Sequence, residues 1–166
     1  LTFGGSGYDI ACASATESLT YQLQDTQNNI QRRISTVDFT PSFTDNLYFV
    51  FLNQKQNSRD GIKQYRQHTS DVSLDIQTIN AITQSMIDCQ SLTSFQQLIH
   101  DHEQVISTLI KEIPIKKRLF NDFKGSIKSL GAWGGDFVLV ASKDNPSSYF
   151  KAKGYNTILS YTEMVL

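Results

Sequence analysis

Apolar and polar residues alternate in three short stretches near the start of the chain, and each stretch predicts a strand. Residues 18–24 have apolar side chains at every second position, which is typical of a half-buried strand. Residues 31–39 form a second strand with a less regular alternation. Residues 47–52 are continuously apolar, which predicts a central strand buried on both faces.

The middle of the chain has helical periodicity. Ser58 is the expected N-cap of a helix that reaches about His68. A second helix has an apolar stripe made of Val72, Ile76, Ile79, Met86 and Ile87, with Ile82 and Thr83 on the intervening turn. A third has a clearer stripe made of Phe95, Leu98, Ile99, His102, Val105, Ile106 and Leu109. Thr93 and Gln96 before it form a capping-box pattern. We interpret both stripes as core.

The last third of the chain returns to strand-like patterns. Residues 125–130 and 137–141 are expected strands on either side of a loop, residues 131–136. Asn145 and Pro146 begin a short helix that ends before Gly154, and residues 157–165 form a closing strand. From residue 47 onward the order is strand, helices, strand, strand, helix, strand. This order predicts an α+β fold with a ferredoxin-like split βαβ arrangement and an enlarged first crossover.

Composition and charge exclude several classes of protein. The chain has 15 basic and 16 acidic residues, so no strong positive field is available to bind nucleic acid or an anionic membrane. No apolar run reaches the roughly 20 residues of a membrane-spanning helix. Two distant cysteines indicate a reducing compartment, and we expect a cytoplasmic protein. The chain opens without an initiator Met, and we expect part of the polypeptide to lie upstream.

Two glycine-rich segments carry the candidate chemistry. The first precedes a helix-compatible stretch that begins near Asp9, and it is either a tight turn or a loop whose backbone approaches a ligand. Residues 5–13 (Gly-Ser-Gly-Tyr-Asp-Ile-Ala-Cys-Ala) resemble the Ser-Gly-x-Asp-x-Ala segment of the GHMP small-molecule kinases. Residues 128–136 (Lys-Ser-Leu-Gly-Ala-Trp-Gly-Gly-Asp) resemble that family's C-terminal Gly-Ala-Gly-Gly-Gly motif.

The resemblance covers essentially the whole chain and implies a domain organisation. Residues 1–46 would be the end of the N-terminal region that carries the catalytic aspartate, with strands that belong to the N-terminal half. Residues 47–166 would be the ferredoxin-like C-terminal domain of the family.

The resemblance also implies roles for individual residues. Asp9 would lie at the acceptor oxygen as a general base or an electrostatic orienter, and Ser6 and Gly7 would hold the loop that directs it. Lys128 would place a cation near a phosphorylated substrate, although a solvated lysine at a strand end is the simpler alternative. The nucleotide and substrate loop would consist of Gly131, Ala132, Gly134, Gly135 and Asp136.

Four further residues in two segments are assigned to substrate binding. Lys55, Ser58 and Arg59 stand where related kinases have a Ser/Thr-rich loop that opens a helix near the substrate. They would bind an anionic group, or they are a helix cap with solvated charges. Trp133 replaces a small glycine of the family motif, so its indole either forms a wall of the substrate pocket or blocks it.

The expected function is therefore that of an ATP-dependent kinase, in its full-length form, acting on an isoprenoid precursor such as mevalonate or phosphomevalonate. The family's phosphate-binding loop has no counterpart in these residues, so ATP and Mg²⁺ would be held mainly upstream and this chain alone would be inactive. The alternative is a non-catalytic ligand-binding or assembly module of the same fold. A small-molecule partner is expected, and former interface surface would allow a homodimer. We assign no metal ligand, because His100 and His102 diverge on a helix.

Overall fold

The computed structural model describes residues 6–26, 29–54, 71–131, 133 and 136–165. The chain divides into two compact units, residues 1–40 and residues 41–166, which we describe separately. The sequence analysis placed a boundary between residues 46 and 47. Its assignment of the two parts to regions of a kinase stays a prediction.

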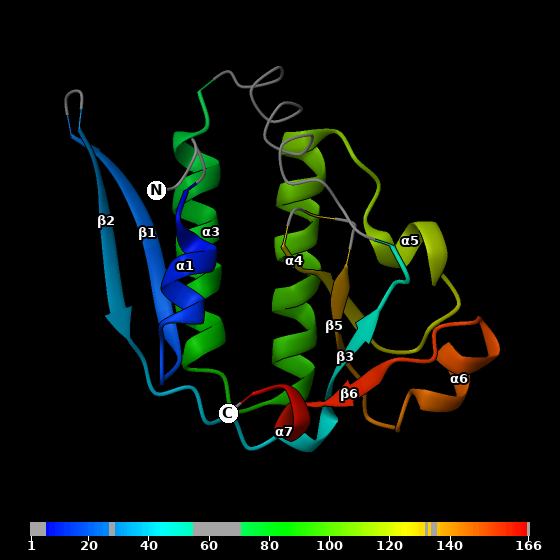
Figure 1. The fold of residues 1–166 in the computed structure, drawn as a ribbon. Coiled ribbons are helices and arrows are strands. Elements are labelled where there is room, and N and C mark those ends of the chain that lie inside the picture. The colour runs from blue at the N-terminus through cyan, green and yellow to red at the C-terminus, as the bar shows by residue number, and fades with distance from the viewer. Residues whose placement is uncertain (1–5, 27–28, 55–70, 132, 134–135, 166) are drawn as a thin grey trace. The chain divides into compact units, whose positions relative to one another are not determined.

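Unit 1 consists of a short helix and a β-hairpin (Figure 1). Helix α1 spans Tyr8–Ala13, and strands β1 (Leu19–Thr26) and β2 (Asn29–Thr36) pair antiparallel, with Leu19 opposite Thr36. Both predicted strands are present. The second spans Asn29–Thr36 and does not reach residue 39 as predicted.

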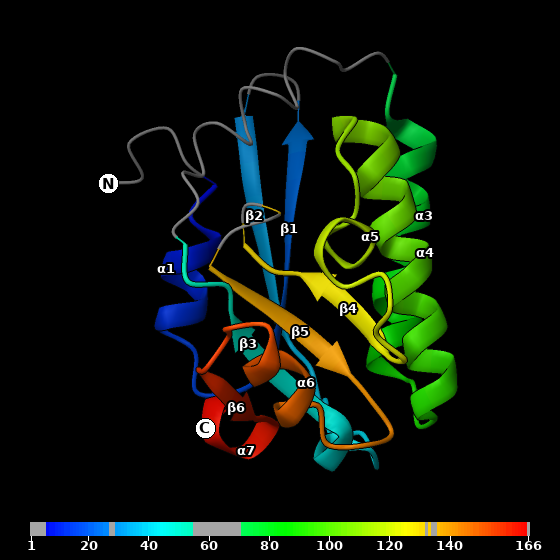
Figure 2. The same ribbon diagram turned by 90° about the vertical axis from the view of Figure 1, so that its right-hand side faces the viewer.

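Unit 2 contains a four-stranded antiparallel sheet. Its strands are β3 (Leu47–Phe51), β4 (Ser126–Ser129), β5 (Phe137–Ala141) and β6 (Ile158–Ser160). The strand order is β4-β5-β3-β6, and every pair of neighbours is antiparallel (Figure 2). Val50 lies opposite Val138 and Ile127 opposite Val140. The predicted central position of β3 is confirmed, although only Leu47 and Val50 of this strand are fully buried.

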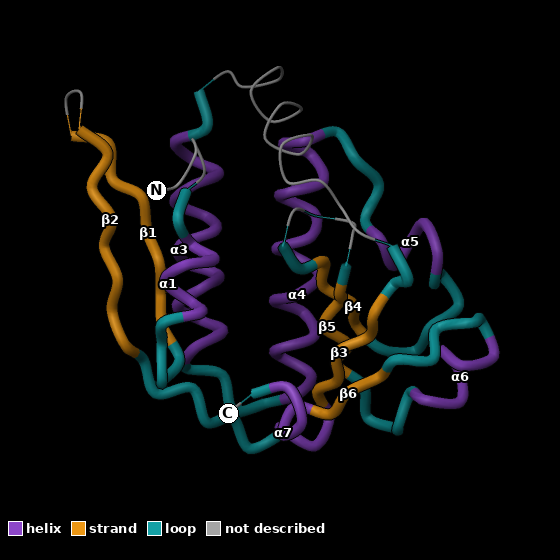
Figure 3. The backbone as a smooth tube through the Cα atoms, in the orientation of Figure 1, coloured by secondary structure: helices purple, strands orange, loops and turns teal. Residues whose placement is uncertain are grey.

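The helices of unit 2 differ widely in length. Within the described residues they are the 3-10 helix η1 (Thr44–Asn46) and the α-helices α3 (Ser73–Ile87), α4 (Leu92–Ile110), α5 (Ile115–Leu119), α6 (Ser147–Ala152) and α7 (Tyr161–Met164). Helices α3 and α4 pack side by side, and α4 also packs against β4 (Figure 3). No helix within the described ranges has the length and apolarity needed to cross a bilayer.

A buried hydrophobic cluster of unit 2 lies on one face of the sheet. Side chains alternate between the faces of a strand, and the inward ones of β3, β4 and β5 meet an aromatic group from the helices and loops. The buried cluster consists of Val50, Leu52, Ile115, Phe120, Phe123, Ile127, Val138, Val140 and Phe150. Gly125 is needed beside this cluster, since a Cβ there would lie 2.6 Å from Phe123 Cε1 and 2.7 Å from the Ala141 carbonyl oxygen.

The interpretation of the α3 stripe as core was wrong. Ile82 is the only residue of α3 that is buried, and Ile76 is 51% exposed. Helix α3 packs on α4 rather than directly on the sheet, so it buries a narrower surface than its apolar residues could cover. The stripe of α4 does face the core, with Phe95 and Ile99 buried.

The predicted closing strand over residues 157–165 was also wrong in extent. Strand β6 ends at Ser160, and α7 begins at the next residue. Ser160 and Glu163 form a capping box, in which the Glu163 carboxylate accepts hydrogen bonds from the Ser160 backbone N–H (2.8 Å) and hydroxyl (2.6 Å). This reciprocal cap stabilises a helical turn where apolar residues alone suggested a strand.

Two other helix starts differ from the expected ones. Helix α4 has Ser91 as its N-cap, whose Oγ accepts from the Ser94 N–H at 3.4 Å, so the expected box at Thr93 is not the cap. Helix α6 begins at Ser147. Pro146 is therefore its N-cap and not its first helical residue, so the predicted start was one residue too early, although the Ser147 N–H does donate to the Asn145 side chain at 2.9 Å.

Candidate functional site

The loop that joins β4 to β5 has an unusual backbone. Gly131 has a φ of 60°, which glycine adopts without penalty, but Trp133 has a φ of 54° and Asp136 a φ of 20°. A left-handed conformation costs a non-glycine residue roughly 1–2 kcal/mol. The Asp136 carbonyl oxygen accepts a hydrogen bond from Leu52 N–H at 2.7 Å, which fixes the end of the loop on the strand side.

A hydrogen bond to helix α4 offsets the strain at Trp133. The indole Nε1–H donates to Oε1 of Glu103 at 3.2 Å, and the indole is half-buried. The predicted alternatives for Trp133 were a wall of a substrate pocket and a block to it. Neither is tested by this contact, and both stay predictions. The contact itself attaches the loop to α4.

Glu103 is the buried carboxylate at the centre of this site. Its side chain follows Ile99 by one helical turn on the inward face of α4, and the residue is only 3% exposed. The Ser129 backbone N–H donates to Oε1 at 3.2 Å, and the Ser129 hydroxyl donates to Oε2 at 3.0 Å. Both oxygens therefore have partners, as buried polar atoms require.

Lys128 supplies the opposite charge. Its Nζ lies 4.0 Å from Glu103 Oε1, 3.4 Å from His102 Nδ1 and 3.3 Å from the Ser129 carbonyl oxygen. Its side chain is 19% exposed, so it is not the solvated strand-end lysine that the sequence left open. Its predicted contact with a phosphorylated substrate stays a prediction.

Burial shifts the protonation equilibria of all three groups. It raises the pKa of Glu103, a shift that is opposed first by Lys128 and then by the hydrogen bonds from Ser129 and Trp133. It lowers the pKa of Lys128, against the attraction of Glu103. Burial, followed by the charge of Lys128, lowers the pKa of His102 to about 4. His102 is therefore a neutral acceptor for the Lys128 ammonium near neutral pH.

Sequence reasoning missed Glu103 and saw only a core residue in His102. One signal was available for Glu103, because it continues the apolar stripe of α4 four residues after Ile99. A carboxylate on the inward face of a helix requires a partner. The sequence does not indicate which residue is that partner. Lys128 and Trp133 lie about 25–30 positions after Glu103, on a strand and a loop, and only the tertiary fold brings them near it.

The other predicted site lies in unit 1. Gly7 is buried and has a φ of 83°, which only glycine adopts readily, and Asp9 is exposed in the first turn of α1. The Ser6 carbonyl oxygen accepts hydrogen bonds from the Tyr21 hydroxyl (2.5 Å) and from Arg32 Nε (3.1 Å). The hairpin thus holds the turn that precedes Asp9.

Several predicted site residues lie outside the described residues. They are Lys55, Ser58, Arg59, Ala132, Gly134 and Gly135. Their assignments to anion binding and to the nucleotide and substrate loop stay predictions.

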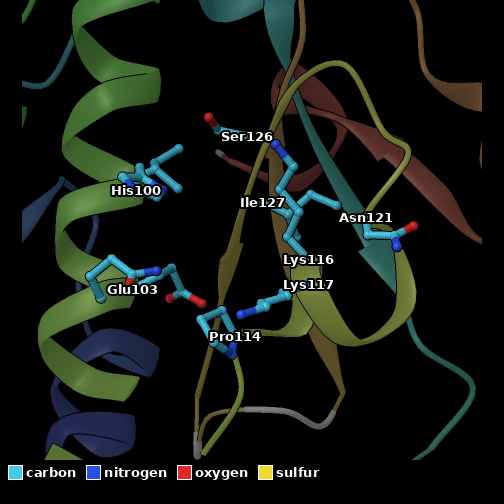
Figure 4. A pocket seen from close by; sticks show the side chains of 10 residues that line it. His100, Glu103, Pro114, Lys116, Lys117, Asn121, Ser126 and Ile127 are labelled. Carbon is cyan, nitrogen blue, oxygen red and sulfur yellow. The ribbon is translucent and has the colours of Figure 1, made fainter. Parts of the chain in front are cut away.

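A pocket of about 240 Å³ opens beside Glu103 within unit 2. His100 and Glu103 contribute to it from α4, and Pro114, Lys116, Lys117 and Asn121 line the opposite side (Figure 4). The remaining lining residues are Ile99, Gln104, Ser126 and Ile127.

No protein-family model and no curated protein matches this sequence.

Proposed function

We propose that this chain is the C-terminal part of a small-molecule kinase of the GHMP type, which transfers the γ-phosphoryl group of ATP to a small anionic metabolite. Mevalonate and phosphomevalonate represent the class of acceptor. The arrangement of unit 2 carries the proposal: a four-stranded sheet with the order β4-β5-β3-β6 and a glycine-containing loop between β4 and β5. This is the strand order that a ferredoxin-like split βαβ unit would have.

The positions of the two motifs support the same proposal. The first motif forms a turn with a left-handed Gly7 that leads directly into α1, with Asp9 exposed in its first turn. The second motif begins in β4 and continues into the loop that Glu103 holds through Trp133. Phosphoryl transfer needs mainly positioning and charge neutralisation, so a fixed loop and an exposed carboxylate are suitable components.

The cofactors are assigned to the complete gene product. Among the described residues, no group of three or more His, Cys, Asp or Glu side chains is arranged to hold a metal ion. We derive no step through Mg²⁺ or ATP.

Asp9 provides the direct test of this function. In the complete gene product, Asp9→Asn should lower kcat by about 10²-fold or more, because a carboxylate that accepts the hydroxyl proton contributes on that scale. The measurement is ADP release with Mg·ATP across mevalonate, phosphomevalonate, homoserine, galactose and a blank without acceptor. The preferred acceptor would identify the substrate class.

Glu17→Gln is the matched control, since it removes an exposed carboxylate from the same unit. It should leave kcat unchanged. Near-normal turnover in Asp9→Asn would contradict the catalytic role proposed for Asp9. A gene product that binds the acceptors without releasing ADP would instead favour the non-catalytic binding module.

A further inference from the structure

The pocket beside Glu103 has a distribution of charge that the proposed kinase function does not use. Lys116 and Lys117 line one side of it, from helix α5 (Figure 4). In the part of the chain that the structure describes, the ion pairs are Lys128 with Glu103 and Lys153 with Asp122. The two pocket lysines take part in neither pair.

The carboxylate in the pocket wall does not neutralise these lysines. Glu103 accepts two hydrogen bonds from Ser129 and one from Trp133, and its counter-charge is Lys128. The charge that remains available to a ligand is therefore positive. Asn121 and Gln104 add amide groups, which donate hydrogen bonds to an anion without adding charge.

The size and the apolar lining of the pocket limit the ligand further. A volume of about 240 Å³ corresponds to roughly eight water molecules at about 30 Å³ each. It is smaller than the roughly 300–1,000 Å³ of sites for drug-sized ligands. Ile99, Pro114 and Ile127 provide apolar contacts inside it. A small molecule with a short hydrocarbon part fits this space better than a bare ion does.

We propose that this pocket binds a small organic anion, a carboxylate or a phosphate monoester with a short apolar body. Lys116 and Lys117 bind the anionic group, and Ile99, Pro114 and Ile127 contact the body. This site goes beyond the proposed kinase function, because every residue that forms it belongs to unit 2 and none is a predicted catalytic or nucleotide-loop residue.

Four probes with the same four-carbon body separate charge from shape. They are butyrate, butyl phosphate, butanol and butylamine, and inorganic phosphate tests the head group alone. Binding to the complete gene product is measured without nucleotide by isothermal titration calorimetry. Butyl phosphate and butyrate should bind at least about tenfold more tightly than butanol or inorganic phosphate, and butylamine should not bind. Equal affinity for butanol and butyrate, or a preference for butylamine, would overturn the proposal.

Variants locate the binding. Lys116→Gln/Lys117→Gln should weaken butyl phosphate binding by about tenfold or more, as expected for the loss of charge-assisted hydrogen bonds. Lys124→Gln/Lys143→Gln makes the same change of charge at exposed positions outside the pocket and should retain the affinity. Equal weakening of butyl phosphate binding in both double variants would indicate non-specific electrostatic attraction and would overturn the proposed site.

A steric variant keeps the test valid if the double variant folds poorly. Gln104 is exposed on α4 and lines the pocket, so Gln104→Phe fills the pocket without disturbing the core. It should abolish binding of both anions while ADP release in the kinase assay stays unchanged. Retained binding in Gln104→Phe would contradict the site whatever the outcome of the kinase assay.

Discussion

At the scale of single residues, His102 has an environment unlike that of the exposed His100 on the same helix. Its Nδ1 lies 3.4 Å from the Lys128 ammonium, and the ring is partly withdrawn from solvent. A protonated imidazole there would meet a second cation at short distance. Burial of the ring, and after it the charge of Lys128, disfavours the protonated form in the folded protein, so the pKa of His102 falls to about 4.

This shift predicts a dependence of stability on pH. Between about pH 4 and 6.5 the unfolded chain binds a proton at His102 that the folded chain does not bind, so the contribution of His102 to the free energy of unfolding rises with pH. The raised pKa of Glu103 acts in the opposite sense, since the folded state keeps that proton longer as the pH rises. Because Glu103 is present in both proteins, the difference between the native chain and His102→Gln isolates the histidine.

Urea unfolding at pH values of about 4.5, 5.5 and 6.5 measures that difference. The difference in the free energy of unfolding should grow by less than about 1.4 kcal/mol per pH unit, because the His102 ring is partly exposed. His100→Gln, which removes an exposed imidazole two residues away, is the matched control. The same dependence on pH in both variants would contradict the lowered pKa of His102.

At the scale of elements, the interaction of α4 with β4 depends on a charged pair within an apolar surrounding. Glu103 comes from the helix, and Lys128 comes from the edge strand. Removal of one partner leaves the other charge buried without compensation, whereas removal of both leaves none. The two residues should therefore be strongly coupled in stability.

A double-mutant cycle measures this coupling. Glu103→Gln or Lys128→Met alone should each lower the free energy of unfolding by about 3 kcal/mol, and the double variant should cost clearly less than the sum. The exposed pair Lys153 and Asp122, 3.3 Å apart, is the control, and its coupling should be far smaller despite the shorter distance. Additive effects at Glu103 and Lys128 would rule out the coupling.

Local patterns predicted most elements of the fold, and they failed where tertiary contacts decide. The apolar run of β3 and the stripe of α4 were sufficient because both are buried by several neighbours. The apolar stripe of α3 was misleading, since α3 packs chiefly on one helix. Near the C-terminus, the capping box at Ser160 stabilises a helical turn where the sequence pattern predicted a strand. For the site, the glycines of the sequence predicted the loop between β4 and β5. They did not predict that Glu103, on a helix distant in sequence, binds this loop through Trp133.

At the scale of the whole molecule, the two units differ in what stabilises them. Among the described residues, the buried apolar side chains begin at Phe43, so all of them belong to unit 2. Unit 1 has a two-stranded hairpin and one short helix, and such a hairpin is marginally stable by itself in water. Stability is therefore concentrated in residues 41–166.

Separate expression of the two units tests this difference. Residues 41–166 should unfold cooperatively in urea, with circular dichroism typical of an α+β protein, because their core is self-contained. Residues 1–40 alone should have the spectrum of a largely unfolded peptide. A cooperative transition for residues 1–40, or a non-cooperative one for residues 41–166, would contradict this view of the molecule.

Trp133 has one further consequence. It is the only tryptophan in the 166 residues, and its indole N–H contacts a buried carboxylate at the loop between β4 and β5. The fluorescence of an indole responds to the charge and water around it, so the tryptophan emission of these residues originates at Trp133 in this loop. Any event that separates Trp133 from Glu103 changes the colour and intensity of that emission. The loop thus contains an intrinsic optical reporter of its own position.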